Sequence, residues 1–117
     1  MDMEMIFQAL EDWGCDVEGA LERFLDDKEL YMTCLKTVIT DGNFAKLGVA
    51  LKEQNVPLAF DYAHTLKGVF ANLGLTPMFV IVETIVEPLR AGLASHLEEP
   101  YEKLLASNER LKGILGM

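Results

Sequence analysis

Apolar residues recur with a helical period along nearly the whole chain, and this periodicity constrains the fold more than any other feature. Residues three, four and seven apart share one face of an α-helix, whereas a half-buried strand alternates apolar and polar residues. The sequence contains no run of strict alternation, and Asp41-Gly42, a dipeptide typical of hairpins, stands between two helical patterns. The sequence therefore predicts an all-α protein.

Glycine and capping residues divide the first third of the chain into three short predicted helices, which together cover about residues 3–40. Asp26 and Glu29 have the spacing of a capping box, with Asp in place of the usual Ser or Thr, and they open the third helix. The other two are a helix over residues 3–12 that ends at Gly14 and a helix over residues 17–24 capped by Asp16.

Four further helical patterns lie between about residues 43 and 113. Short connections force neighbouring helices to run in opposite directions, so we predict an antiparallel up-down-up-down four-helix bundle with the additional short N-terminal helices beside it. Pro88 lies inside the third pattern, and we expect a bend between Thr84 and Pro88. The predicted boundaries are starts at Asn43, at Pro57 and at Thr76-Pro77, stops near Asn55, at Gly74 and at Gly92, and a linker over residues 95–100 before the last helix.

The composition fits a single domain over residues 1–117. Half of the residues are hydrophobic and a quarter are charged, and the net charge of -9 would repel nucleic acid. The apolar runs are far shorter than the roughly 20 residues that span a bilayer, and the acidic N-terminus is unlike a signal peptide. We therefore expect a cytoplasmic monomer that binds neither nucleic acid nor membrane.

Cys15 and Cys34 lack metal-ligand spacing, and we expect both thiols to be reduced.

His64 lies away from the apolar face of the predicted helix that starts at Pro57. At 100° per residue the apolar face comprises Ala59, Tyr62, Ala63, Leu66, Val69, Phe70 and Leu73. The residues that share the stripe of His64, at a spacing of three, four or seven, are Phe60, Asp61, Lys67, Gly68 and Ala71.

Several interpretations of this histidine are open from the residues alone. It can be a solvated residue or a member of a polar network, and Phe60 can be a core residue. A metal site needs a second ligand at helical spacing, and only Asp61 is available, so we expect no metal here; His96 falls in a predicted turn. The third interpretation is chemical: a neutral imidazole is a nucleophile, Lys67 can stabilise a phosphoryl group on it, and Gly68 leaves room for another molecule.

At these residues the sequence resembles the histidine phosphotransfer (HPt) domain family. The motif AHTLKG at residues 63–68, followed by ANLG at residues 71–74, is similar to the family's hallmark helix. GCDVEGALERFLDDKELYMTCL at residues 14–35 resembles the family's entrance segment. The helix after Pro77 resembles the family less, because VEPLRAG has Val86 where members often have leucine, and it contains Pro88.

The resemblance implies the roles of the site residues and the partners. His64 would carry the phosphoryl group, Lys67 would stabilise it, Gly68 would give clearance, and Phe60, Asp61 and Ala71 would contact the partner. The partners would be response-regulator receiver domains and a hybrid sensor histidine kinase, with the receiver supplying the magnesium ion and no ATP site in this chain. Two alternatives stay open, namely an interaction module without transfer and a metal- or haem-binding bundle. A polar residue of the following helix would support the phosphohistidine, with Glu83, Thr84 and Glu87 as candidates.

Overall fold

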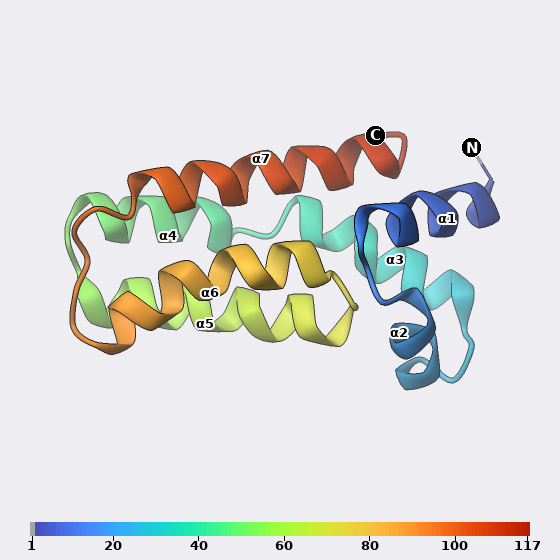
Figure 1. Ribbon diagram of the computed structural model, residues 1–117, viewed down its shortest axis with the longest axis horizontal. Coiled ribbons are helices and arrows are strands. Elements are labelled where there is room, and N and C mark those ends of the chain that lie inside the picture. Colours follow the sequence, from blue (N-terminus) through green and yellow to red (C-terminus); the bar gives the residue numbers. More distant parts are fainter. Residues whose placement is uncertain (1) are drawn as a thin grey trace.

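The computed structural model describes residues 2–117, and every regular element among them is an α-helix (Figure 1). The predicted all-α fold is therefore confirmed. The helices are α1 (Met3–Trp13), α2 (Val17–Arg23), α3 (Lys28–Ile39), α4 (Asn43–Lys52), α5 (Val56–Asn72), α6 (Thr76–Arg90) and α7 (Glu98–Ile114).

Helices α4 to α7 form an antiparallel bundle in which each helix runs opposite to the one before it (Figure 1). The closest packing joins α5 to its two sequence neighbours, α4 and α6, and α6 in turn packs on α7. The short turns determine which helices are neighbours. A connection of three residues, such as residues 73–75, is too short for α6 to pack anywhere except antiparallel to α5.

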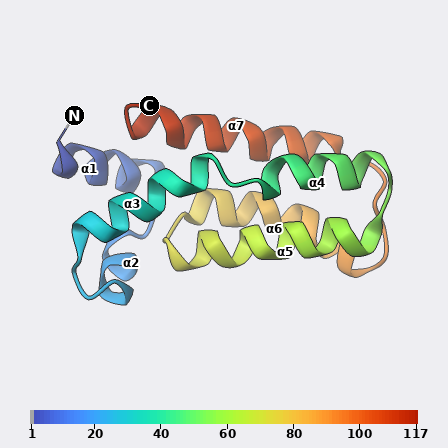
Figure 2. The same ribbon diagram turned by 180° about the vertical axis from the view of Figure 1, so that it is seen from behind.

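Helix α3 continues roughly along the line of α4, so that α7 lies beside both (Figure 2). Residues 40–42 interrupt the two helices, as the Asp41-Gly42-Asn43 sequence predicts, and the Asp41 carboxylate accepts a hydrogen bond from the Asn43 N–H at 2.8 Å. Helices α1 and α2 lie at the end of the bundle where α5 meets α6 (Figures 1 and 2).

Tyr31 of α3 ties this end of the molecule together. Its ring is fully buried and lies 5.6 Å from the rings of both Phe7 and Phe24, while its hydroxyl donates to the carbonyl of Leu73 at 2.8 Å. A buried phenol needs such a partner, since an unpaired hydroxyl in the core is costly. The C-terminus of α5 is thereby held against α1, α2 and α3.

The turn from α5 to α6 depends on Gly74. Its φ of +66° is in the left-handed region, and the backbone of Asp16 lies where a β-carbon would sit, so a side chain is excluded for two reasons. The Gly74 carbonyl accepts a hydrogen bond from the Asp16 N–H at 2.8 Å. The predicted stops at Gly14, Gly74 and Gly92 are all confirmed by a positive φ just beyond the helix.

Several predicted helix starts are wrong by one to three residues, and α5 begins at Val56, one residue before Pro57. Asp27, and not Asp26, caps α3, because Asp26 has a φ of +59° in the preceding turn and the Asp27 carboxylate accepts from the Leu30 N–H at 3.0 Å. Thr76 belongs to the first turn of α6 and makes no capping bond to it. Helix α7 begins at Glu98, so the predicted linker ends at Leu97 and Pro100 lies in the first turn, where proline loses no hydrogen bond.

Pro88 is accommodated near the end of α6. The helix continues through it to Arg90, and only the carbonyl of Thr84, four residues earlier, loses a helical donor. The bend expected between Thr84 and Pro88 stays a prediction.

Candidate functional site: an exposed histidine on α5

Helix α5 presents His64 to solvent because its opposite face is buried in the bundle. The Asn55 side chain accepts from the Leu58 N–H at 3.2 Å and starts the helix, and Pro57 fits its first turn. His64, Asp61, Gly68 and Ala71 are exposed. The buried residues that fix this orientation are Ala59, Ala63, Leu66 and Phe70.

Phe60, one turn before His64, stacks on the imidazole. The two ring centroids are 5.4 Å apart and the planes differ by 10°. The Phe60 side chain is half-buried, and the guanidinium carbon of Arg90 on α6 lies 5.2 Å from the centroid of the same ring. Phe60 therefore lies at the boundary of the core, in contact with His64. The interpretation of Phe60 as a core residue is only partly confirmed.

Lys67 forms an ion pair that crosses from α5 to α6. Its Nζ atom is 2.8 Å from Oε1 of Glu83, with 21% of the lysine side chain and 41% of the glutamate side chain exposed. The ammonium also lies 5.5 Å from the centroid of the Phe79 ring, within the range of a cation–π contact. Helix α6 thus supplies both the counter-ion and the apolar surface that hold this lysine.

The three acidic or polar candidates on α6 have different partners. Glu83 pairs with Lys67, Glu87 lies 3.5 Å from Nε of Arg90, and the Thr84 hydroxyl donates to the carbonyl of Ile81 at 2.6 Å. Glu83 is the candidate that is joined to a residue of the HPt-like motif. Glu87 is linked to the site only through Arg90.

Gly68 leaves open space one turn after His64. A β-carbon added at this position would meet no heavy atom within 4 Å. Nothing inside the bundle requires glycine here, so its cost of about 1 kcal/mol relative to alanine in a helix has no compensation within the chain. Room for an approaching molecule would provide one.

Sequence reasoning missed Arg90 and Phe79. Both come from α6, and a helical wheel of α5 contains no information on which residues of a neighbouring helix face it. A basic residue in the last turn of the predicted helix after Pro77 is the only sequence signal for Arg90, and it points equally well to helix-dipole stabilisation.

Metal-ligand clusters and membrane-spanning helices are both absent from the part of the chain that the structure describes. Residues 2–117 contain no group of three or more His, Cys, Asp or Glu side chains that could hold a metal ion. His96 is exposed in the connection between α6 and α7, with a φ of +63°. Within the same residues no helix is both long enough and apolar enough to cross a membrane.

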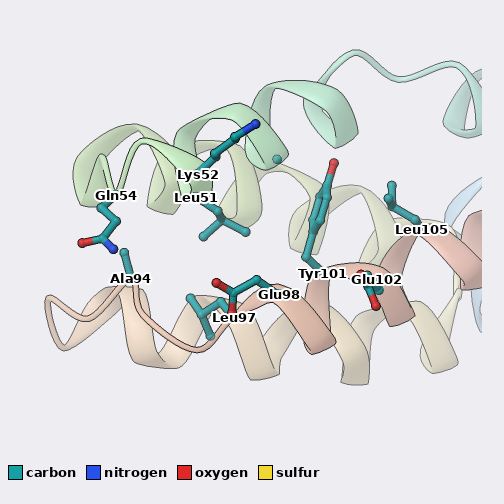
Figure 3. A pocket seen from close by; sticks show the side chains of 10 residues that line it. Leu51, Lys52, Gln54, Ala94, Leu97, Glu98, Tyr101, Glu102 and Leu105 are labelled. Atoms are coloured by element: carbon teal, nitrogen blue, oxygen red, sulfur yellow. The ribbon is translucent and has the colours of Figure 1, made fainter.

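A groove of about 490 Å³ lies between α4 and α7 (Figure 3). Tyr101 crosses it from α7 towards α4 and donates its hydroxyl to the carbonyl of Phe44 at 2.8 Å. Gly48 is required here, because the Tyr101 hydroxyl occupies the place of a β-carbon. No lining residue of the groove belongs to α5 or α6, so the groove and the histidine face are separate.

The chemistry available at this face is limited and specific. An exposed imidazole can attack an electrophile held by another molecule, an ammonium beside it can stabilise an anionic product, and the bare backbone of Gly68 permits close approach. The chain matches the family model described as Hpt domain over residues 19–114, which include the whole of this face. The chain belongs to the Hpt domain family.

Membership implies histidine phosphotransfer in two-component signalling, by a carrier that has no ATP site of its own. The family also implies interaction with receiver domains and kinases. The comparison with curated proteins and the comparison with solved structures give no match.

Proposed function

We propose that this protein is the intermediate carrier of a phosphorelay, accepting a phosphoryl group on His64 from the aspartyl phosphate of one receiver domain and passing it to a second receiver. The observation that carries the proposal is the solvent-exposed imidazole of His64 beside Lys67, at the centre of the segment that matches the Hpt family. A hybrid sensor histidine kinase is the expected source of the first receiver.

The transfer step needs only one nucleophilic nitrogen from this chain. A nitrogen lone pair of the neutral imidazole attacks phosphorus, the bond between phosphorus and the aspartyl oxygen breaks, and the receiver carboxylate leaves with the electron pair. The N–H proton of the other imidazole nitrogen passes to water. The reverse step returns the phosphoryl group to the aspartate of the second receiver. Both links are of high energy, so the transfer is reversible.

Lys67 is the residue that compensates the charge of the phosphohistidine. The product carries about two negative charges, and a lysine one turn away offers an ammonium that can turn towards it. Because Glu83 holds the same ammonium at 2.8 Å, phosphorylation would draw Lys67 partly away from Glu83. The magnesium ion of the reaction would be bound by the acidic pocket of the receiver, and His64, Lys67 and Gly68 need bind none.

The receiver would dock over the stripe of α5 that surrounds His64. Gly68 and Ala71 are exposed and small, so a partner helix can approach the backbone closely. Asp61 is exposed at the edge of the same stripe, where it can select partners by charge. Phe60 contributes the apolar part of this surface.

A relay experiment tests this function. A phosphorylated receiver is mixed with a second, unphosphorylated receiver in the presence of the wild-type chain or of His64→Gln, and the label on each protein is followed with time. We expect the label to reach the second receiver only with the wild-type chain. Binding of both receivers without any transfer would instead identify a non-catalytic interaction module.

A further inference from the structure

We propose that Phe60 is a positioning residue for His64, and that its ring, with Arg90 over it, fixes the plane of the imidazole from which the nitrogen attacks. This inference rests on the proposed function of His64. It gives Phe60 a role within the chain itself, in addition to any contact with a partner.

The first step of the argument is the geometry of the stack. The rings of Phe60 and His64 are nearly parallel, with planes 10° apart and centroids 5.4 Å apart, a separation typical of offset stacking. The lone pair of an imidazole nitrogen lies in the ring plane. A stacked neighbour therefore covers a face of the imidazole while leaving the nucleophilic edge accessible, which is the arrangement that an in-line attack requires.

The second step concerns the freedom of the imidazole. An exposed side chain on a helix normally samples several rotamers, and a nucleophile reacts only from those that point towards its electrophile. Phe60 restricts this sampling, because each rotation of the imidazole away from the stack loses the aromatic contact. The stack thus prepares the ring before the partner arrives.

The third step is the anchoring of Phe60 itself. Arg90 lies 5.2 Å from the Phe60 centroid, and its Nε atom is 3.5 Å from a carboxylate oxygen of Glu87. Phe60 belongs to α5, and its ring contacts α6 through Arg90. A ring held from α6 is a firmer support for His64 than a free surface phenylalanine would be.

A purely partner-contacting role for Phe60 makes a different prediction. If Phe60 only touched the receiver, its replacement would slow transfer from the receiver and leave His64 unchanged towards a small phosphoryl donor. If Phe60 positions the imidazole, both reactions become slower. Phosphoramidate, protonated on its nitrogen, is such a donor: the histidine nitrogen bonds to phosphorus, the P–N bond breaks and ammonia leaves with the electron pair. The N–H proton of the other imidazole nitrogen passes to water.

The first measurement is the proton NMR spectrum of the imidazole in the unphosphorylated protein. We expect the ring protons of His64 to carry a ring-current shift that disappears in Phe60→Leu and is kept in Phe60→Tyr. His96, exposed and without an aromatic partner among the described residues, serves as the reference within each sample. Identical His64 shifts in wild type and Phe60→Leu would overturn the proposal.

The second measurement is the rate at which phosphoramidate labels His64. We expect Phe60→Leu to be about two- to tenfold slower, as the usual strength of an aromatic pair implies, and Phe60→Tyr to retain the wild-type rate. Leu58→Ala, an exposed apolar residue of the same helix, is the control and should react like wild type. Equal rates in Phe60→Leu and wild type would overturn the proposal, whereas a wild-type chain that shows the NMR shift but takes no label from a phosphorylated receiver would refute the proposed function instead.

Discussion

At the scale of single residues, the site is organised by pairs of side chains that join α5 to α6. Lys67 and Glu83 form one pair at 2.8 Å, and Phe60 and Arg90 form the other at 5.2 Å. Both pairs flank His64, so the position of α6 decides the electrostatic and apolar environment of a histidine on α5. Glu83 partly balances the charge of Lys67. In the proposed mechanism this charge would become available as a phosphoryl group arrived at His64.

Replacement of Glu83 should favour the phosphorylated protein. In Glu83→Gln the carboxylate that competes for Lys67 is gone, and so is its repulsion of the phosphoryl group. We expect the equilibrium fraction of phosphohistidine, measured against a receiver of fixed concentration, to rise by a factor of about two to five, as the value of a half-exposed ion pair implies.

Lys67→Ala is the matched opposite of that change. It should slow transfer and lower the same fraction while the fold is retained, because the Lys67 ammonium makes only partly exposed contacts, with Glu83 and with the Phe79 ring. A lower phosphohistidine fraction in Glu83→Gln, or unfolding of Lys67→Ala, would contradict this account of the pair.

We expect Gly68 to make the helix less stable and to give a receiver closer access to His64. Because the space around its missing β-carbon is open, Gly68→Ala should raise the free energy of unfolding by up to about 1 kcal/mol, and Gly68→Gln should slow transfer from a receiver on the order of tenfold. Gly113→Gln on α7, also surrounded by open space, is the control and should transfer at the wild-type rate. Wild-type transfer by Gly68→Gln would refute the clearance argument.

At the scale of secondary-structure elements, α5 is held at both of its ends by side-chain hydrogen bonds. Asn55 accepts a hydrogen bond from the Leu58 N–H, and the carbonyls of Ala71 and Asn72 at the other end accept from Arg23 of α2 at 3.0 Å. Both ends of the helix are thereby tied down, and His64, in its middle, is kept on the exposed face.

Capping provides a test in which the sequence and the structure disagree. Asn55→Ala should lower the free energy of unfolding by about 1 kcal/mol, whereas Thr76→Ala, at the position that the sequence predicts as a cap, should change it by less than about 0.5 kcal/mol. Urea denaturation of both variants measures the difference. A larger loss in Thr76→Ala than in Asn55→Ala would mean that the threonine is the cap after all.

The sequence predicts the elements well and their ends less well. Apolar period and glycine stops are local signals, and both are sufficient to place α5 and its exposed stripe. The choice between Asp26 and Asp27 as the cap of α3 depends instead on which residue takes a positive φ, and that is decided by how the preceding turn packs. Two adjacent aspartates look alike in sequence.

At the scale of the whole molecule, the sequence does not predict which residues of α6 contact the residues around His64. The sequence offers Glu83 as one of three equal candidates and does not indicate a role for Arg90, because the rotation of α6 against α5 results from the packing of the entire core. The fold class needed no such information, since helical period and short turns already restrict the chain to an antiparallel bundle. Local patterns thus predict the histidine and its stripe, and tertiary packing adds the α6 residues.

The buried end of the molecule should make the protein sensitive to alkali. Burial raises the pKa of the Cys15 thiol from 9.0 to about 12, an effect that Arg110 only partly offsets, and burial also raises the pKa of Tyr31 above 10.0. The folded protein then holds both protons more tightly than the unfolded chain. The contribution of Cys15 to the free energy of unfolding is complete below pH 9.0 and is lost as the pH rises towards 12, and the contribution of Tyr31 is lost only above pH 10.0. Each loss is at most about 1.4 kcal/mol per pH unit.

Urea denaturation at neutral pH and at stepped pH values above 9.0 measures this loss. Cys15→Ala and Tyr31→Phe should each show a shallower decline than wild type, even if they are less stable at neutral pH. The same decline in all three proteins would show that other groups cause the alkaline unfolding.

The central claim is that the exposed imidazole of His64 carries the phosphoryl group, and the chemical nature of the label tests it most directly. After incubation with a phosphorylated receiver, the phosphorus-31 NMR spectrum of the separated chain should contain one phosphoramidate resonance that survives base, is lost in acid and is missing from His64→Gln. A resonance that survives acid, or one that persists in His64→Gln, would contradict the account.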